Sequence, residues 1–187
     1  MTRPEALEWY NYRLLLLDQR KLPLEVSFLD CRCAEDVAVA IETLAVRGAP
    51  AIGIAAAYGV VLDATTKRDA IAAIDRLSLT RPTAVNLFHA LARMRAIVAG
   101  LPDVPLRDRL LAEAHAIRSA DIAANETMGF FGQSLLPQNS TVYTHCNAGA
   151  LATGGFGTAL GVMRAAVRAG KTIRVFADET RPLLQGS

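Results

Sequence analysis

Two short apolar runs lie near the start of the chain, with a polar segment between them. The runs cover residues 12–18 and 24–31, and the segment between them is 19–23. Apolar runs of this length, joined by about five residues, are typical of paired strands. The pattern therefore predicts an N-terminal β-hairpin.

The period of the apolar positions changes at Ala34. From there to Leu44 the apolar residues recur at helical spacing, which predicts a helix that ends near Gly48. Pro50 stands where a new helix begins, and proline is favoured at the first helical position. Residues 51–62 are apolar nearly all round. We therefore expect this second helix to lie in the core.

Three more helical patterns follow, at residues 68–79, 84–99 and 106 to about 136. Residues 80–83 and 100–103, which contain proline, separate them. The first two-thirds of the chain therefore reads as mostly helical.

The pattern changes again after residue 140. A β-type run at 142–146, a helix at 158–169 and a second β-type run at 172–177 predict a βαβ unit. A right-handed crossover would place both strands parallel, with their carboxyl ends at one edge. We therefore predict an α/β fold. A mostly helical N-terminal domain with a small strand element (1–135) would precede the first, incomplete unit of a Rossmann-like parallel-sheet domain (136–187).

Composition narrows the class of protein. Of the 187 residues, 52% are hydrophobic and 20% are charged, which excludes intrinsic disorder. The 20 basic and 18 acidic residues are interleaved, so we expect binding to neither nucleic acid nor an acidic membrane. The apolar stretch 49–62 is too short to span a bilayer. The N-terminus lacks the charge order and cleavage site of a signal peptide, so we expect a cytoplasmic location. In such a reducing compartment, an odd number of cysteines, three, favours thiols over disulfides.

Two arginines precede predicted helices. Arg47, Gly48 and Ala49 lead into the apolar helix, where unpaired backbone N–H groups attract anions and the arginine adds a fork for phosphate. Arg81 stands just before the helix at 84–99. Each has a plainer interpretation: a tight turn with a solvated Arg47, and an exposed loop arginine at position 81.

Cys146 and Asp178 end the two predicted parallel strands, at the edge where open α/β sheets bind ligands. Between them, residues 147–157 form a glycine-rich connection that could direct N–H groups at a thiolate or an oxyanion. The alternative is that Cys146 is a small buried residue of a core strand.

Two other chemistries fit poorly. The glycines at 155 and 157, with Asp178 about 20 residues on, approach a dinucleotide fingerprint, but Leu160 replaces the third glycine. Cys31 and Cys33 lack further metal ligands nearby. We expect neither a nicotinamide cofactor nor a metal.

Four segments together carry a family resemblance. They are RGAPAIG (47–53), RPTAVNL (81–87), THCNAGALAT (144–153) and ETRPLLQG (179–186). In order and spacing they resemble the N-terminal portion of methylthioribose-1-phosphate isomerases. That family is similar to the regulatory α, β and δ subunits of initiation factor 2B and to ribose-1,5-bisphosphate isomerase. The resemblance covers essentially the whole chain.

The resemblance implies an isomerase of methionine salvage, which makes 5-methylthioribulose 1-phosphate from 5-methylthioribose 1-phosphate without a cofactor and as a homodimer at full length. It implies that Cys146 is catalytic and that a set of residues binds the sugar phosphate: Arg47, Gly48, Ala49, Arg81 and Gln185. The family's catalytic aspartate matches no residue of this chain, so we expect the 187 residues alone not to turn over substrate. A regulatory initiation-factor subunit and a ribose-1,5-bisphosphate isomerase-like enzyme stay open as alternatives.

Overall fold

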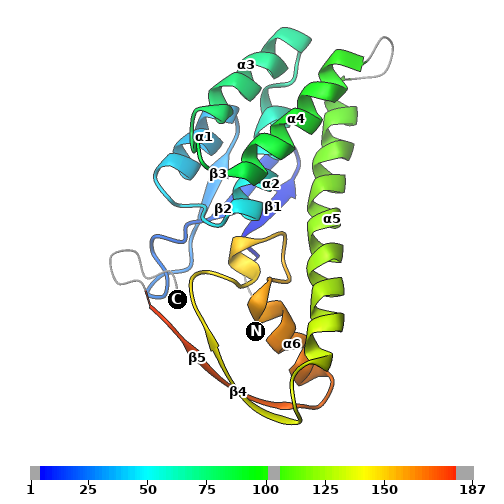
Figure 1. Cartoon of the computed structure of the whole chain (residues 1–187). Helices are drawn as coiled ribbons and strands as arrows, with labels where there is room; N and C mark the ends of the chain where they lie inside the picture. Colours follow the sequence, from blue (N-terminus) through cyan, green and yellow to red (C-terminus); the bar gives the residue numbers. More distant parts are fainter. Residues whose placement is uncertain (1–4, 101–105, 180–187) are drawn as a thin grey trace.

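The N-terminal strands form a small antiparallel sheet. The computed structural model describes residues 5–100 and 106–179 (Figure 1). Strand β1 (Leu7–Tyr10) pairs with β2 (Arg13–Leu17), and β2 pairs with β3 (Phe28–Cys31). The predicted hairpin is confirmed as β2 and β3, but its second strand begins at Phe28 rather than Leu24, so residues 18–27 form the connection that was predicted for 19–23. The pattern did not predict β1, because only four residues with two buried or half-buried side chains carry it.

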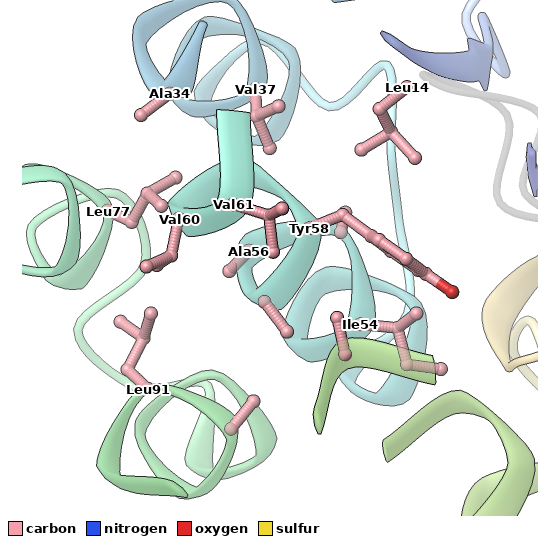
Figure 2. Packing of buried hydrophobic residues seen from close by; sticks show 14 of the residues in the cluster. Leu14, Ala34, Val37, Ile54, Ala56, Tyr58, Val60, Val61, Leu77 and Leu91 are labelled. Carbon is pink, nitrogen blue, oxygen red and sulfur yellow. The ribbon is translucent and has the colours of Figure 1, made fainter. Parts of the chain in front are cut away.

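Five helices follow the sheet, and the second of them occupies the centre. They are α1 (Ala34–Glu42), α2 (Ala49–Asp63), α3 (Lys67–Ser78), α4 (Val85–Gly100) and α5 (Leu106–Ser134). Every α2 side chain from 51 to 62 is buried, as its apolar sequence predicted. Figure 2 shows Tyr58, Val60 and Val61 of α2 among side chains of the surrounding helices. The helices α1, α3, α4 and α5 are therefore arranged around α2.

The first helix is shorter than the pattern predicted. It ends at Glu42 instead of near Gly48. Leu44 takes a left-handed conformation with φ of 62°, and the N–H of Val46 then donates to the carbonyl of Ala40. Helices commonly end through a residue in this conformation, which is usually glycine. Because the residue at this position is a leucine, the sequence gives no sign that α1 ends here.

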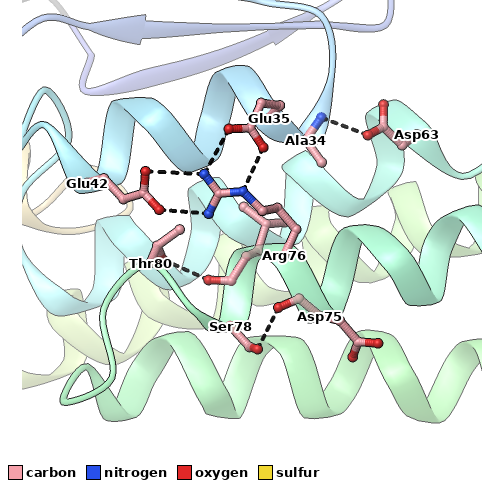
Figure 3. A network of polar contacts seen from close by, with 9 residues as sticks. Ala34, Glu35, Glu42, Asp63, Asp75, Arg76, Ser78 and Thr80 are labelled. Carbon is pink, nitrogen blue, oxygen red and sulfur yellow. Dashed lines mark hydrogen bonds and ion pairs between the residues drawn. The ribbon is translucent and has the colours of Figure 1, made fainter.

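Surface ion pairs join the first and third helices. Arg76 of α3 lies between Glu35 and Glu42 of α1, and its guanidinium donates to both carboxylates (Figure 3). Asp63, at the end of α2, accepts a hydrogen bond of 3.0 Å from the N–H of Ala34. These contacts fix α1 against α2 and α3.

The predicted βαβ unit is present. Strand β4 (Asn139–Thr144) pairs in parallel with β5 (Thr172–Ala177), and α6 (Ala159–Arg168) connects them after a short 3₁₀ turn, η1 (Ala150–Ala152). The α/β fold class is therefore confirmed.

The long helix α5 is shared by both parts of the molecule. It packs on α2 and α4 along one stretch and on α6 towards its C-terminal end (Figure 1). Gly129 allows this second contact, since a Cβ there would lie 2.9 Å from the Phe156 ring and 3.2 Å from the carbonyl of Gly161. Within the described ranges, no helix is both long and apolar enough to cross a membrane.

Candidate active site

Arg47 is buried just before α2. It is 6% exposed, and its Nη2 donates to the main-chain carbonyl of Gln19. Burial lowers the pKa of the Arg47 guanidinium, and the negative charges of Glu179 and Asp18 act in the opposite direction. A buried guanidinium needs such compensation, because an uncompensated charge is costly to remove from water. The alternative of a solvated Arg47 is therefore wrong.

Gly48 connects Arg47 to the helix and touches the segment that follows Cys146. Its φ is +94°, and a Cβ on it would lie 2.5 Å from the Cα of Ala152. Only glycine fits both the conformation and the contact. The exposed Ala49 then begins α2. Gly48 has no side chain to cap the helix, so the positive N-terminal end of α2 lies beside η1 without a side-chain cap from Gly48.

Arg81 lies in the loop before α4, half-buried rather than fully exposed. The first turns of α2 and α4 are in close contact, since a Cβ on Gly53 would lie 2.6 Å from the carbonyl oxygen of Asn86. Arg47 and Arg81 therefore precede two helices whose N-terminal turns lie side by side.

Strand β4 ends at Thr144, two residues earlier than the pattern predicted, so Cys146 lies just beyond the strand rather than at its end. Its thiol is exposed, and its backbone is left-handed with φ of 65°. Non-glycine residues adopt this conformation rarely, and such residues cluster at functional sites. The alternative of a buried core-strand cysteine is therefore wrong.

Three glycine N–H groups of the glycine-rich connection already have hydrogen-bond acceptors within the protein. The N–H of Gly154 donates to Asp121 of α5 at 2.7 Å. The hydroxyl of Thr153 accepts from Gly155 at 3.3 Å and from Gly157 at 3.1 Å. For these three N–H groups, the expectation that they point at a thiolate or an oxyanion is therefore wrong. They shape the turn into α6 instead.

The carboxyl ends of β4 and β5 lie together, as expected. The N–H of Asp178 donates to the carbonyl of Thr144 at 3.1 Å, so Asp178 is adjacent to the start of the Cys146 segment. Tyr143 and His145 both contact the Asp178 carboxylate, with 2.7 Å to His145 Nδ1. These hydrogen bonds hold the pKa of Asp178 below its usual range, and the same contact raises the pKa of Tyr143. Sequence reasoning missed this cluster, because its side chains meet only when the strands pair.

Sequence reasoning also missed Gln19. It follows β2, is 1% exposed, and donates from Nε2 to the carbonyl of Leu151 at 2.9 Å. A polar residue directly after an apolar run was the only local sign of it. Gln185 lies outside the described residues. In the part of the chain that the structure describes, no three metal-ligating side chains lie together.

Comparisons with known proteins show which proteins this chain is similar to. A family model described as "Initiation factor 2 subunit family" matches residues 45–187. The chain is 52% identical over 195 residues to the methylthioribose-1-phosphate isomerase of Heliobacterium modesticaldum, covering 98% of this chain and 56% of that protein.

Two solved structures are also similar. The crystal structure of the translation initiation factor eIF-2B subunit delta from A. fulgidus is 44% identical, with a TM-score of 0.87 over 99% of this chain and 57% of that one. The crystal structure of 5-methylthioribose 1-phosphate isomerase from Pyrococcus horikoshii OT3 is 39% identical, with a TM-score of 0.88 over 98% of this chain and 55% of that one. The chain thus spans about half the length of the relatives it matches.

Proposed function

Because the chain belongs to the initiation factor 2 subunit family, we propose that it forms part of an aldose–ketose isomerase acting on a sugar phosphate. The proposed substrate is 5-methylthioribose 1-phosphate and the product is 5-methylthioribulose 1-phosphate, a step of methionine salvage. The names of the Heliobacterium and Pyrococcus relatives support this choice.

One observation carries the proposal: the segments of Arg47 and Cys146 meet. Gly48 touches Ala152, which belongs to the short turn after Cys146. Arg81 precedes the helix packed beside the first turn of α2. Arg47 and Arg81 precede two neighbouring helix N-termini, and the α2 N-terminus touches the segment that carries the exposed Cys146 thiol. This arrangement suits a phosphorylated substrate with a reacting carbon next to the phosphate.

Each residue has a role in the proposed reaction. The phosphate would bind at Arg47 with Gly48 and Ala49 and at Arg81, and Gln185 would be a further substrate contact. The anomeric oxygen of this substrate carries the phosphate, so its ring does not open by simple hemiacetal reversal. The ring oxygen needs a proton, and a hydrogen must move from C2 to C1. We assign Cys146 to this acid–base work or to stabilising its transition state.

The same proposal covers the cofactor requirement, the oligomeric state and the location of the protein. The substrate is a small molecule, and hydrogen moves within it, so no cofactor is needed. We propose a homodimer for the full-length protein and a cytoplasmic location, which suits three free thiols. We also keep the division into domains at residues 135 and 136 as a proposal.

The experiment replaces part of a relative with this chain. In a hybrid protein, this chain takes the place of the matching 56% of the Heliobacterium isomerase. We expect the folded hybrid to make 5-methylthioribulose 1-phosphate, and a Cys146→Ser hybrid to lose nearly all of that activity. A hybrid that melts cooperatively but forms no product would contradict the proposal. Product from ribose 1,5-bisphosphate instead would favour the related isomerase.

A second candidate is a regulatory subunit of the initiation-factor type. The similarity to the A. fulgidus structure favours it. A regulatory subunit needs no catalytic thiol. If the chain is one, replacing Cys146 with serine should leave the activity of the hybrid unchanged, whatever that activity is. The same assay therefore separates the two functions.

A further inference from the structure

Three segments that are distant in the sequence meet at Gln19. Its N–H donates to the carbonyl of Ala45 at 3.0 Å, and its own carbonyl accepts from Nη2 of Arg47. Its side-chain amide reaches the other way and donates to the carbonyl of Leu151 at 2.9 Å, across a separation of 132 positions. We call this set, Gln19 with Arg47 and Leu151, the Gln19 junction.

Gln19 and Arg47, two members of the Gln19 junction, are shielded from water. Gln19 is 1% exposed, Arg47 is 6% exposed, and Ala152, next to Leu151, is 3% exposed. A buried amide must have partners, since an unsatisfied one costs free energy. The hydrogen bond to Leu151 is therefore a strong constraint on where η1 lies.

The contact between Gly48 and Ala152 lies next to this hydrogen bond. That contact is a close van der Waals approach of main chain to main chain, which resists compression but holds the two segments together only weakly. The amide of Gln19 supplies the directional attraction. Its main chain at the same time fixes one nitrogen of the Arg47 guanidinium. One residue thus sets the position of both the arginine and the turn after Cys146.

We propose that Gln19 is a positioning residue of the active site, which holds Arg47 and the Cys146 segment at a fixed separation. This inference rests on the proposed isomerase function and adds a residue that does not itself touch the substrate. Phosphate held by Arg47 and a carbon approached by Cys146 must keep one geometry through the reaction. A displacement of about 1 Å in such a geometry costs up to roughly 100-fold in rate.

The first test measures the anchoring itself in the 187-residue chain. Gln19→Met keeps the length of the side chain and removes the amide. We expect amide hydrogen exchange of Ala152 and Thr153 to become about tenfold faster or more, while the amides of α6 keep their rates. The matched control is Gln138→Met, which removes a similar amide bond of 3.0 Å to the carbonyl of Gly170 at an exposed position. Unchanged exchange at Ala152 and Thr153 would overturn the proposal.

A second variant guards against misfolding. Gln19→Glu keeps the shape and polarity of the side chain, but its ionised carboxylate cannot donate to the carbonyl of Leu151. Because burial raises the pKa of a carboxyl, the exchange is measured at a pH high enough to ionise it. A folded Gln19→Glu chain should show the same faster exchange at Ala152 and Thr153. Protection equal to wild type in a folded Gln19→Glu chain would count against the hydrogen bond as the anchor.

The kinetic test uses the hybrid isomerase and asks whether Gln19 acts through Arg47. We expect Gln19→Met to lower kcat/KM between roughly 10-fold and 100-fold. In an Arg47→Lys background the same change should have much less effect, whereas in an Arg81→Lys background it should keep its full effect. If Gln19 had a purely structural role, Gln19→Met would lower activity by the same factor in both backgrounds. That result would overturn the proposal.

The outcomes separate the two proposals. An active hybrid in which Gln19→Met has no kinetic effect overturns the role of Gln19 and leaves the isomerase function standing. A folded wild-type hybrid without product overturns the isomerase function, and with it the role of Gln19 in positioning the active site. The exchange measurement still decides in that case whether Gln19 anchors η1.

Discussion

Gly48 and Ala152 touch main chain to main chain, although more than a hundred residues separate them in the sequence. A Cβ on Gly48 would lie 2.5 Å from the Cα and 2.6 Å from the carbonyl oxygen of Ala152. This contact places the start of α2 against the turn that follows Cys146. The candidate site depends on that approach more than on either segment alone.

We predict that Gly48→Ala destabilises the chain more than Gly170→Ala does. Both glycines have positive φ, +94° and +83°, so alanine is strained by about 1–3 kcal/mol at each. Among the described residues, an added Cβ meets a neighbour within 4 Å at Gly48 but not at Gly170, and overpacking at Gly48 adds about 1–3 kcal/mol. Urea unfolding of both variants measures the difference. Equal losses of stability would show that the contact with Ala152 yields easily.

A second glycine tests the contact between α2 and α4. Gly53→Ala would place a Cβ 2.6 Å from the carbonyl oxygen of Asn86, and we expect a loss of about 1–3 kcal/mol. A Cβ on Gly100, the last residue of α4, would meet no atom of the described residues within 4 Å, so Gly100→Ala should be neutral or gain up to about 1 kcal/mol. Thermal or urea unfolding checks both. A Gly53→Ala chain as stable as wild type would mean that the helices separate at no cost.

Much of the architecture was predictable from the sequence because its signals are local. The apolar helix at 51–62 and the strand at 172–177 follow from hydrophobic pattern alone, and the structure has both. The left-handed Leu44 that ends α1 could not be predicted, since nothing distinguishes it from a helical leucine.

The candidate site was predictable only in part. Arg47 and Cys146 were identified by their places at a helix start and a strand end. The contacts of Gln19 and Asp121 could not be found in this way, because each reaches a segment more than 30 positions away. The use of the glycine N–H groups within their own turn is likewise visible only once Thr153 and Asp121 are in place.

Asp121 should be important for the stability of the glycine-rich turn. Its carboxylate accepts from the N–H of Gly154 at 2.7 Å and from Nδ2 of Asn125 at 3.0 Å. Asp121→Ala leaves both donors without this acceptor, and we expect a loss of about 1–3 kcal/mol. The matched control is Asp75→Ala, which removes an exposed helical carboxylate paired with Arg95 and should cost at most about 1 kcal/mol. Similar losses in both, by urea unfolding, would contradict the anchoring role of Asp121.

The ion pairs of Arg76 should make stability depend on pH in the acid range. Hydrogen bonds from Arg76 lower the pKa of Glu35 and of Glu42 from the ordinary value of 4.5. A carboxyl with a depressed folded-state pKa adds stability that is fully present above its unfolded pKa and is lost as the pH falls through the folded pKa. The difference in stability between wild type and Arg76→Gln should therefore be largest above pH 4.5 and shrink below it. A difference that stays constant down to about pH 3 would exclude this linkage.

Thiol labelling should distinguish Cys146 from the other two cysteines. Cys146 is exposed, whereas Cys31 is 1% exposed, and burial raises the pKa of the Cys31 thiol to about 12. Burial also raises the pKa of the half-buried Cys33. Because the thiolate is the reactive form, an aromatic disulfide reagent should modify Cys146 first in the native chain.

The cysteine variants identify the fast thiol. Cys146→Ser should abolish the fast phase of labelling, and Cys33→Ser should leave it intact. In the hybrid isomerase, 5-methylthioribose 1-phosphate should slow the labelling of Cys146, since the proposed site places the substrate over the thiol. A fast phase that persists in Cys146→Ser would contradict the exposed position of this cysteine. Labelling that substrate does not slow in an active hybrid would place Cys146 outside the binding site.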